Sequence, residues 1–237
     1  MTTKREKRIL SIDLKQLWFD LKWVYPNSFN MIVQKWQLSI ISIFLIISAF
    51  YLDEPTHALI TSISSAFWDN IFTFGRWYGS GAPTLYLFLA LYIAGFVFKK
   101  VKMRDTGFLI GETYIFAGLI TLIFKSFFGR ARPYTNQGDL FFSGLDLTDN
   151  SYFSLSSGHA NVAFCLSMVL ASKTNNIYLK IFYYALAVIT CISRIYHNQH
   201  WFSDVLIGAM IAILVSSVLI ELHRLKFKAV NTTVKTV

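Results

Sequence analysis

The chain has 237 residues, of which 54% are hydrophobic in type, 17% are aromatic and only 15% are charged, with a formal net charge of +9. A soluble domain of this size would carry roughly 25% charged residues, so the composition argues against the soluble classes. The apolar residues stand in long contiguous stretches, which indicates an all-α, polytopic membrane protein. We expect membrane lipids around it and no nucleic acid as a partner.

Residues 1–35 form a leader before the first apolar stretch. Five apolar residues recur in it at helical spacing: Leu10, Leu14, Leu17, Leu21 and Val24. With charged residues between them, this pattern suits an amphipathic helix on the membrane surface, and the alternative is a solvated basic tail. No small-residue cleavage site follows the first apolar stretch, so the leader does not resemble a signal peptide.

Six apolar stretches approach the roughly 20 residues that a helix needs to cross a bilayer. They lie at residues 36–53, 82–98, 107–124, 158–173, 177–193 and 201–222. Polar residues and a glycine interrupt the segment 56–80, which we therefore expect to be an interfacial helix. The sequence thus predicts a six-helix membrane domain over 36–222 with an outer loop at 134–155, followed by a basic tail at 223–237.

The basic residues are distributed unevenly between the two sides of this arrangement. The leader, the second and fourth loops and the tail together hold 17 of the 22 Lys and Arg residues. By the positive-inside rule this side is cytoplasmic, and both termini lie on it. A basic chain of this kind fits a bacterial inner membrane, with the opposite face toward the periplasm.

Three polar patches lie at those ends of the predicted spans that face outward. They occupy residues 125–133, 156–159 and 193–204. Four of the five outward-facing cations lie within the first and third patches, against the charge bias, and anion binding supplies a local reason for them. Since all three patches face the same side, we expect them to share one pocket.

The third patch contains a histidine and an aspartate four residues apart, His200 and Asp204. On a helix this spacing places both side chains on one face. A carboxylate beside an imidazole fixes the ring's tautomer and stabilises the cation that forms when the ring attacks. An isolated aspartate in an apolar helix would be costly, so it needs a partner. We expect that partner to be His200.

The remaining polar residues suit the handling of a phosphate group. Lys125, Arg132 and Arg194 bring three cations to one surface, as phosphoryl transfer requires. Ser157 and Gly158 open a helix whose free N–H groups can bind an anion. The histidine that follows them, His159, could protonate a leaving oxygen.

These motifs occur in the order Lys-x6-Arg-Pro, Ser-Gly-His and Ser-Arg-x5-His-x3-Asp, and they resemble the type 2 phosphatidic acid phosphatase (PAP2) superfamily over about residues 80–220. The resemblance implies a phosphatase in which His200 becomes phosphorylated, Asp204 supports it, and His159 serves as acid and then as base. The phosphate-binding residues that it implies are Lys125, Arg132, Ser157, Gly158 and Arg194. Ser156 stands where the family usually has proline, which removes no catalytic group.

The resemblance points to a lipid phosphate as substrate, namely undecaprenyl diphosphate, phosphatidylglycerol phosphate, phosphatidic acid or lipid A. A lipid phosphotransferase and a non-catalytic binding or transport protein are the alternatives. Vanadium haloperoxidases share the motifs but are soluble. We expect no cofactor and no metal, because the neighbouring cations would repel a divalent ion.

Two charged residues are left with open roles, and the oligomeric state is open as well. Arg130 could read a lipid headgroup or face the phosphates of the surrounding lipids. Glu112 could be a hydrogen-bonding residue within the bundle or part of a substrate path.

Overall fold

The computed structural model describes residues 4–63, 65–145 and 148–235, with side chains for 12–63, 65–145 and 148–226. Asp146 of the expected outer loop, and the side chain of Leu10 in the leader, lie outside the described residues. The α-helices are α1 (Lys4–Gln34), α2 (Trp36–Tyr51), α3 (Asp53–Thr61), α4 (Ala66–Tyr78), α5 (Gly81–Val97), α6 (Val101–Phe128), α7 (Gly158–Ser172), α8 (Ile177–Tyr196) and α9 (Phe202–Lys235), with two short 3₁₀ helices at Pro133–Thr135 and Asn150–Tyr152. The described residues form no β-strand.

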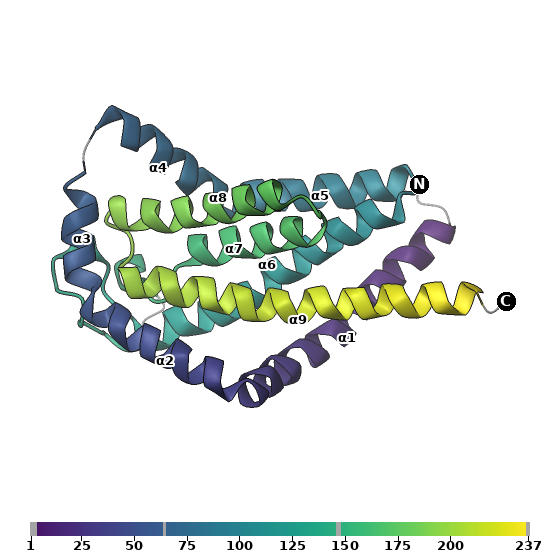
Figure 1. The fold of residues 1–237 in the computed structure, drawn as a ribbon, viewed down its shortest axis with the longest axis horizontal. Helices are drawn as coiled ribbons and strands as arrows, with labels where there is room; N and C mark the ends of the chain where they lie inside the picture. Colours follow the sequence, from purple (N-terminus) through teal and green to yellow (C-terminus); the bar gives the residue numbers. More distant parts are fainter. Residues whose placement is uncertain (1–3, 64, 146–147, 236–237) are drawn as a thin grey trace.

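Helices α6 to α9 form the centre of the molecule, and α5 packs along α6 (Figure 1). Buried aliphatic and aromatic side chains such as Leu109, Phe116 and Val215 fill the space between them. Glycine permits the close contact of α5 with α6, because a Cβ atom on Gly95 would lie only 2.3 Å from the backbone nitrogen of Arg104. The two termini lie at one end of this bundle, and α3 with the loop between α6 and α7 lies at the other.

Each of the six apolar stretches coincides with a helix: α2, α5, α6, α7, α8 and α9. Three helices, α6, α8 and α9, are long and apolar enough to cross a membrane by themselves. The pairs α1–α2 and α4–α5 qualify only if each is counted as one broken span, with bends of 92° and 51°. The described chain is therefore an all-helical membrane protein with three to five candidate spans.

The segments around these spans differ in detail from the expectation. Residues 56–80 hold two helices, the end of α3 and all of α4, where one interfacial helix was predicted. Ser65 is the N-cap of α4, since its side chain accepts a hydrogen bond from the backbone nitrogen of Trp68. At the C-terminus, α9 continues to Lys235. The boundary predicted at residue 222, between the membrane domain and the basic tail, is therefore not the end of a helix.

The leader folds as the long helix α1, and its apolar stripe packs against protein. Val24 is fully buried, and Leu17 and Leu21 pack against the central core. Asp20 is also fully buried, and it is bound by Lys226 of α9 at 2.5 Å. This part of the leader is therefore not a solvated tail.

A network of charged side chains ties α1, α6 and α9 together toward the end of the molecule that holds the termini. The two ring nitrogens of His223 lie 2.8 Å from Asp105 Oδ1 and 2.6 Å from Glu112 Oε2. Lys226 binds Asp20 in the same region. Of the two roles considered for Glu112, the structure shows the hydrogen-bonding one. We call these five residues the termini-end network.

Candidate active site

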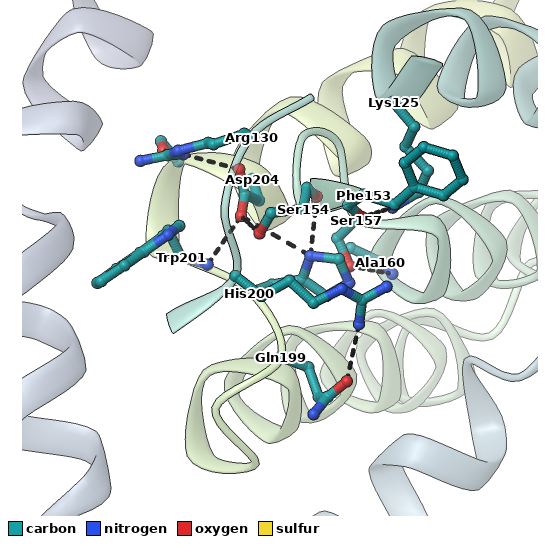
Figure 2. Close-up of polar contacts among 12 residues, drawn as sticks. Lys125, Arg130, Phe153, Ser154, Ser157, Ala160, Gln199, His200, Trp201 and Asp204 are labelled. Atoms are coloured by element: carbon teal, nitrogen blue, oxygen red, sulfur yellow. Dashed lines mark hydrogen bonds and ion pairs between the residues drawn. The ribbon is translucent and has the colours of Figure 1, made fainter. Parts of the chain in front are cut away.

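The three polar patches of the sequence converge at the end of the bundle opposite the termini (Figure 2). Gly129 ends α6 in the left-handed conformation, with φ of 56°, and a Cβ atom there would lie 2.0 Å from the carbonyl oxygen of Gly144. The chain reverses direction after this turn, and Arg130 forms an isolated antiparallel β-bridge with Phe142. The loop thereby brings Arg130 into contact with Ser203 and Asp204 at the start of α9, and Arg132 into contact with Gln199 just before it.

His200 lies in the connection between α8 and α9, and its ring is almost fully buried. The ring Nδ1 lies 2.9 Å from the carbonyl oxygen of Ser154, which can only accept a hydrogen bond. Nδ1 therefore carries the proton, and Nε2 keeps a free lone pair. Burial lowers the pKa of His200 well below its ordinary value, Asp204 opposes this shift, and Lys125 adds to it.

Asp204 is fully buried in the first turn of α9, close to His200 but not in hydrogen-bond contact with it. Its Oδ2 atom is 3.7 Å from His200 Nδ1, and it accepts hydrogen bonds from Ser154 Oγ at 2.5 Å and from the backbone nitrogen of Trp201 at 2.9 Å. Asp204 therefore lies within ion-pair distance of His200, as expected, but it makes no direct hydrogen bond to the ring in this structure. His200 lies before the helix begins, and Ser154 bridges the two side chains.

Two arginines at the site have buried N–H groups without a partner among the described residues. Arg132 donates to Gln199 at 2.7 Å and to Asn150 at 2.9 Å, but its Nε has no acceptor. Arg194 has no acceptor for Nε or Nη1. Buried donors of this kind are rare in folded proteins unless a ligand or water satisfies them. An anion with several oxygens would supply the missing acceptors.

Lys125 and His159 line the same cavity, which has a volume of about 520 Å³ and lies between α5, α6 and α7. The ammonium group of Lys125 donates to the carbonyl oxygen of Phe153 at 2.5 Å. His159 is partly exposed and lies within electrostatic reach of Arg194, Lys125 and Arg132. The structure thus brings these predicted site residues together around one space.

The beginning of α7 is fixed by the residue that precedes it. Ser157 accepts a hydrogen bond from the backbone nitrogen of Ala160, at 3.4 Å, as an N-cap. Its own backbone nitrogen donates to the carbonyl oxygen of Asp204 at 2.9 Å. The backbone N–H of Ser157 is therefore already hydrogen-bonded within the protein. It cannot bind an anion, as had been expected of the backbone around Ser157 and Gly158.

Arg130 has neither of the roles considered for it, because its side chain is completely buried. It binds Asp53 and Asp204, each at 2.7 Å. Burial raises the pKa of Asp53 above its ordinary value, whereas the neighbouring guanidinium acts to lower it. Neither Asp53 nor Ser154 was predicted from the sequence as part of the site. The rule that a charge beside an apolar stretch needs a partner could have drawn attention to Asp53.

The described residues contain one group of His and carboxylate side chains close enough to share a metal ion, namely Asp20, Glu112 and His223. These residues belong to the termini-end network and not to the site. The cation Lys226 already binds Asp20, and both ring nitrogens of His223 already face carboxylates.

Comparison with known proteins gives a family match and two similar structures. The model of the PAP2 superfamily matches residues 106–228, which is more than half of the chain. The crystal structure of LpxE from Aquifex aeolicus is 25% identical, with a TM-score of 0.54 over 72% of this chain and 95% of that one. The crystal structure of a transmembrane PAP2-type phosphatidylglycerolphosphate phosphatase from Bacillus subtilis is 21% identical, with a TM-score of 0.59 over 76% of this chain and 92% of that one. No curated protein sequence matches significantly.

Proposed function

This chain belongs to the PAP2 superfamily, and we propose that it is a membrane phosphatase that hydrolyses a phosphomonoester or diphosphate of a lipid through a phosphohistidine intermediate. The observation that carries the proposal is the position of buried His200 next to two arginines with donors that lack acceptors among the described residues. The backbone nitrogen of His200 donates to the carbonyl oxygen of Arg194 at 3.3 Å, and its ring lies within electrostatic reach of Arg132. A site for binding alone would need these cations but no nucleophile. The held Nδ1–H of His200 leaves Nε2 free to attack phosphorus.

The reaction proceeds in two steps. First, Nε2 of His200 forms a bond to phosphorus and the bond from phosphorus to the lipid oxygen breaks. His159, whose protonated form the bound phosphate anion favours against the neighbouring cations, gives its proton to that oxygen. Then His159 takes a proton from water, whose oxygen attacks phosphorus, and the bond to His200 breaks to release inorganic phosphate. Arg132, Arg194 and Lys125 neutralise the phosphoryl oxygens throughout. The role of His159 rests on the family resemblance and on its place in the cavity with Lys125.

We further propose that the chain crosses the inner membrane of a bacterium six times, with the site at the periplasmic face and both termini in the cytoplasm. The domain boundaries remain as the sequence suggests: a leader at 1–35, a phosphatase domain at 36–222 and a tail at 223–237. Two observations support the orientation. Most of the Lys and Arg residues fall in the segments that the predicted topology assigns to the side of the termini, and the site lies at the opposite end of the bundle.

The lipid chains of the substrate have an apolar path to the site. The cavity that holds Lys125 and His159 is also lined by Ile115, Leu119 and Leu122 of α6. The substrate is one of four lipids: undecaprenyl diphosphate, phosphatidylglycerol phosphate, phosphatidic acid or lipid A. The Bacillus subtilis structure is named for one of these, but at 21% identity the likeness shows the fold alone.

Phosphate release from the four lipids, by purified wild type and by His200→Ala with an excess of EDTA, tests the proposal. We expect release by the wild type only, and EDTA should not reduce it, because the site uses fixed cations and no metal ion. If neither protein releases phosphate from any lipid, the hydrolase is the wrong function. Labelled phosphate that appears only on an added acceptor lipid would instead identify a phosphotransferase.

A further inference from the structure

We infer that Arg130 is a positioning residue, which holds Asp204 and through it the ring of His200, and that Asp53 of α3 completes this arrangement. The inference deepens the proposed function and rests on it, because it takes His200 as the nucleophile. Figure 2 shows Arg130 and His200 on opposite sides of Asp204, with Ser154 between the carboxylate and the ring.

All five N–H groups of Arg130 have acceptors inside the protein. Nε donates to the carbonyl oxygen of Asp139 at 2.9 Å. Nη1 donates to Ser203 Oγ at 2.6 Å and to Asp204 Oδ1 at 2.7 Å, and Nη2 donates to Asp53 Oδ2 at 2.7 Å and to Asp139 O at 2.6 Å. Arg132 and Arg194, in contrast, keep donors without partners in the described part of the chain. Arg130 could bind a substrate phosphate only by breaking one of its own bonds.

Asp53 anchors the arginine from a helix that precedes the region matched by the family model. Its Oδ1 accepts from the backbone nitrogen of Ser203 at 2.7 Å, and its Oδ2 accepts from Ser203 Oγ at 2.6 Å. Ser203 lies in the first turn of α9, so the carboxylate also satisfies a free N–H group at the beginning of that helix. Asp53 therefore fixes α3, Arg130 and the start of α9 in one cluster.

The cluster reaches the nucleophile through two further hydrogen bonds. Asp204 is held by Arg130 on Oδ1 and accepts from Ser154 Oγ on Oδ2. The carbonyl oxygen of Ser154 in turn accepts from His200 Nδ1. A shift of Asp204 would therefore move the serine that holds the ring. Misplacement of a reacting group by about 1 Å can cost on the order of 10²-fold in rate.

Arg130 also balances the charge of two buried carboxylates. Asp53 and Asp204 are two fully buried carboxylates, and Arg130 is the cation between them. The three groups together leave one negative charge near His200, which favours the positive ring that forms as Nε2 bonds to phosphorus. The guanidinium also lies over the rings of Phe50, Phe142 and Trp201, at 4.7, 5.6 and 5.8 Å from their centroids. These rings shield it from water and strengthen its attraction to the carboxylates.

The matched variants Arg130→Lys and Arg132→Lys separate positioning from phosphate binding, because they make the same chemical change two residues apart. We expect Arg130→Lys to lower kcat by about 10²-fold and to leave KM within about threefold of wild type. Arg132→Lys should instead raise KM, since it weakens contact with the phosphate. Steady-state kinetics on the best of the four lipids measures both constants. A rise in KM for Arg130→Lys with normal kcat, or no effect, would overturn the inference.

Asp53→Asn tests the same cluster without altering any group close to the phosphate. We expect kcat to fall while KM is kept, and the double variant Arg130→Lys/Asp53→Asn to lose less than the product of the two single effects. Asn has nearly the same shape as Asp, so Asp53→Asn should fold. Its kcat and KM therefore still test the inference if Arg130→Lys fails to fold in detergent. Unchanged kcat for Asp53→Asn would remove Asp53 from the arrangement.

The ring tautomer of His200 supplies a measurement that needs no turnover. In protein with ¹⁵N-labelled histidine, with His200→Ala to assign the signals, we expect the wild-type ring to carry its proton on Nδ1. Arg130→Lys and Asp53→Asn should show a mixture of tautomers. Wild type that is inactive on every lipid would defeat the proposed function, yet these spectra would still decide the inference. A wild-type tautomer in both variants would overturn it.

Discussion

Helices α6 and α9 bury charged side chains at both of their ends, but the two groups are built differently. In the termini-end network, His223 faces two carboxylates and Lys226 faces Asp20, so each cation has an acidic partner. At the site, Lys125, Arg132 and Arg194 contact no carboxylate of the described residues, and within that part of the chain the two arginines keep N–H groups without acceptors. Buried charges need partners in either place.

The difference separates a structural network from a binding site. Carboxylates that pair with cations inside the protein have no further need of a ligand, and they hold α1, α6 and α9 together. An excess of cations with open donors is stable only when an anion is present or when solvent reaches them. Substitutions at the termini end should therefore change stability, whereas substitutions at the site should change activity.

The largest effect is expected from His200→Ala. The nucleophile is lost, so turnover should fall on the order of 10⁴-fold or more, while the protein stays folded in the membrane. Phosphate release and gel filtration in detergent measure the two quantities. Substantial remaining activity would contradict the assignment of His200.

Arg194→Gln should have the next largest effect. It removes a buried cation with two open donors, so kcat/KM should fall about 10²- to 10³-fold. The control is Arg224→Gln, which makes the same change at an exposed position near the termini and should leave kcat/KM unchanged. Equal effects of the two substitutions would remove Arg194 from the phosphate site.

Glu112→Gln tests the termini end of the comparison. Loss of the charge that faces His223 should lower the free energy of unfolding by about 3 kcal/mol, while kcat of the folded protein stays normal. The exposed residue Glu221 provides the same substitution as a control, and Glu221→Gln should leave stability unchanged. Thermal unfolding in detergent measures both. A loss of kcat in Glu112→Gln without a loss of stability would show that the two ends are not separate in function.

The smallest effect is expected when the pH is lowered, on the protonation state of His200. The pKa of His200 is lowered well below its ordinary value of 6.5, so the ring should remain neutral, and Nε2 unprotonated, as the pH falls through that value. The ¹⁵N signals of His200 should accordingly show no titration between about pH 7.5 and pH 6. A midpoint near the ordinary value would mean that water or an anion reaches the ring more freely than its burial indicates.

The sequence was sufficient where a structural property depends on neighbouring residues. The six apolar stretches predicted the positions of six helices, because the length of an apolar run is local information. The three motifs predicted a shared site. Residues of the first two, Lys125 and His159, line one cavity, and Arg132 of the first contacts Gln199, which precedes His200 of the third. Their catalytic roles remain predictions until the variants are measured.

The division of 56–80 into two helices and the packing of α1 could not be predicted in this way. Both depend on which surface each helix contacts in the folded chain, as the fully buried Val24 in α1 illustrates. An amphipathic stripe has the same pattern whether lipid or protein covers it.

By itself, the sequence determined the class of the protein, the helices that form its centre and the family motifs that meet at one end. Only the tertiary structure decided how the charges pair. Ser154 holds the ring of His200 from 46 positions away, and Arg130 binds Asp53 from 77 positions away. Composition and spacing carry no information on such contacts, because the packing of helices distant in the chain selects the partner of each buried charge.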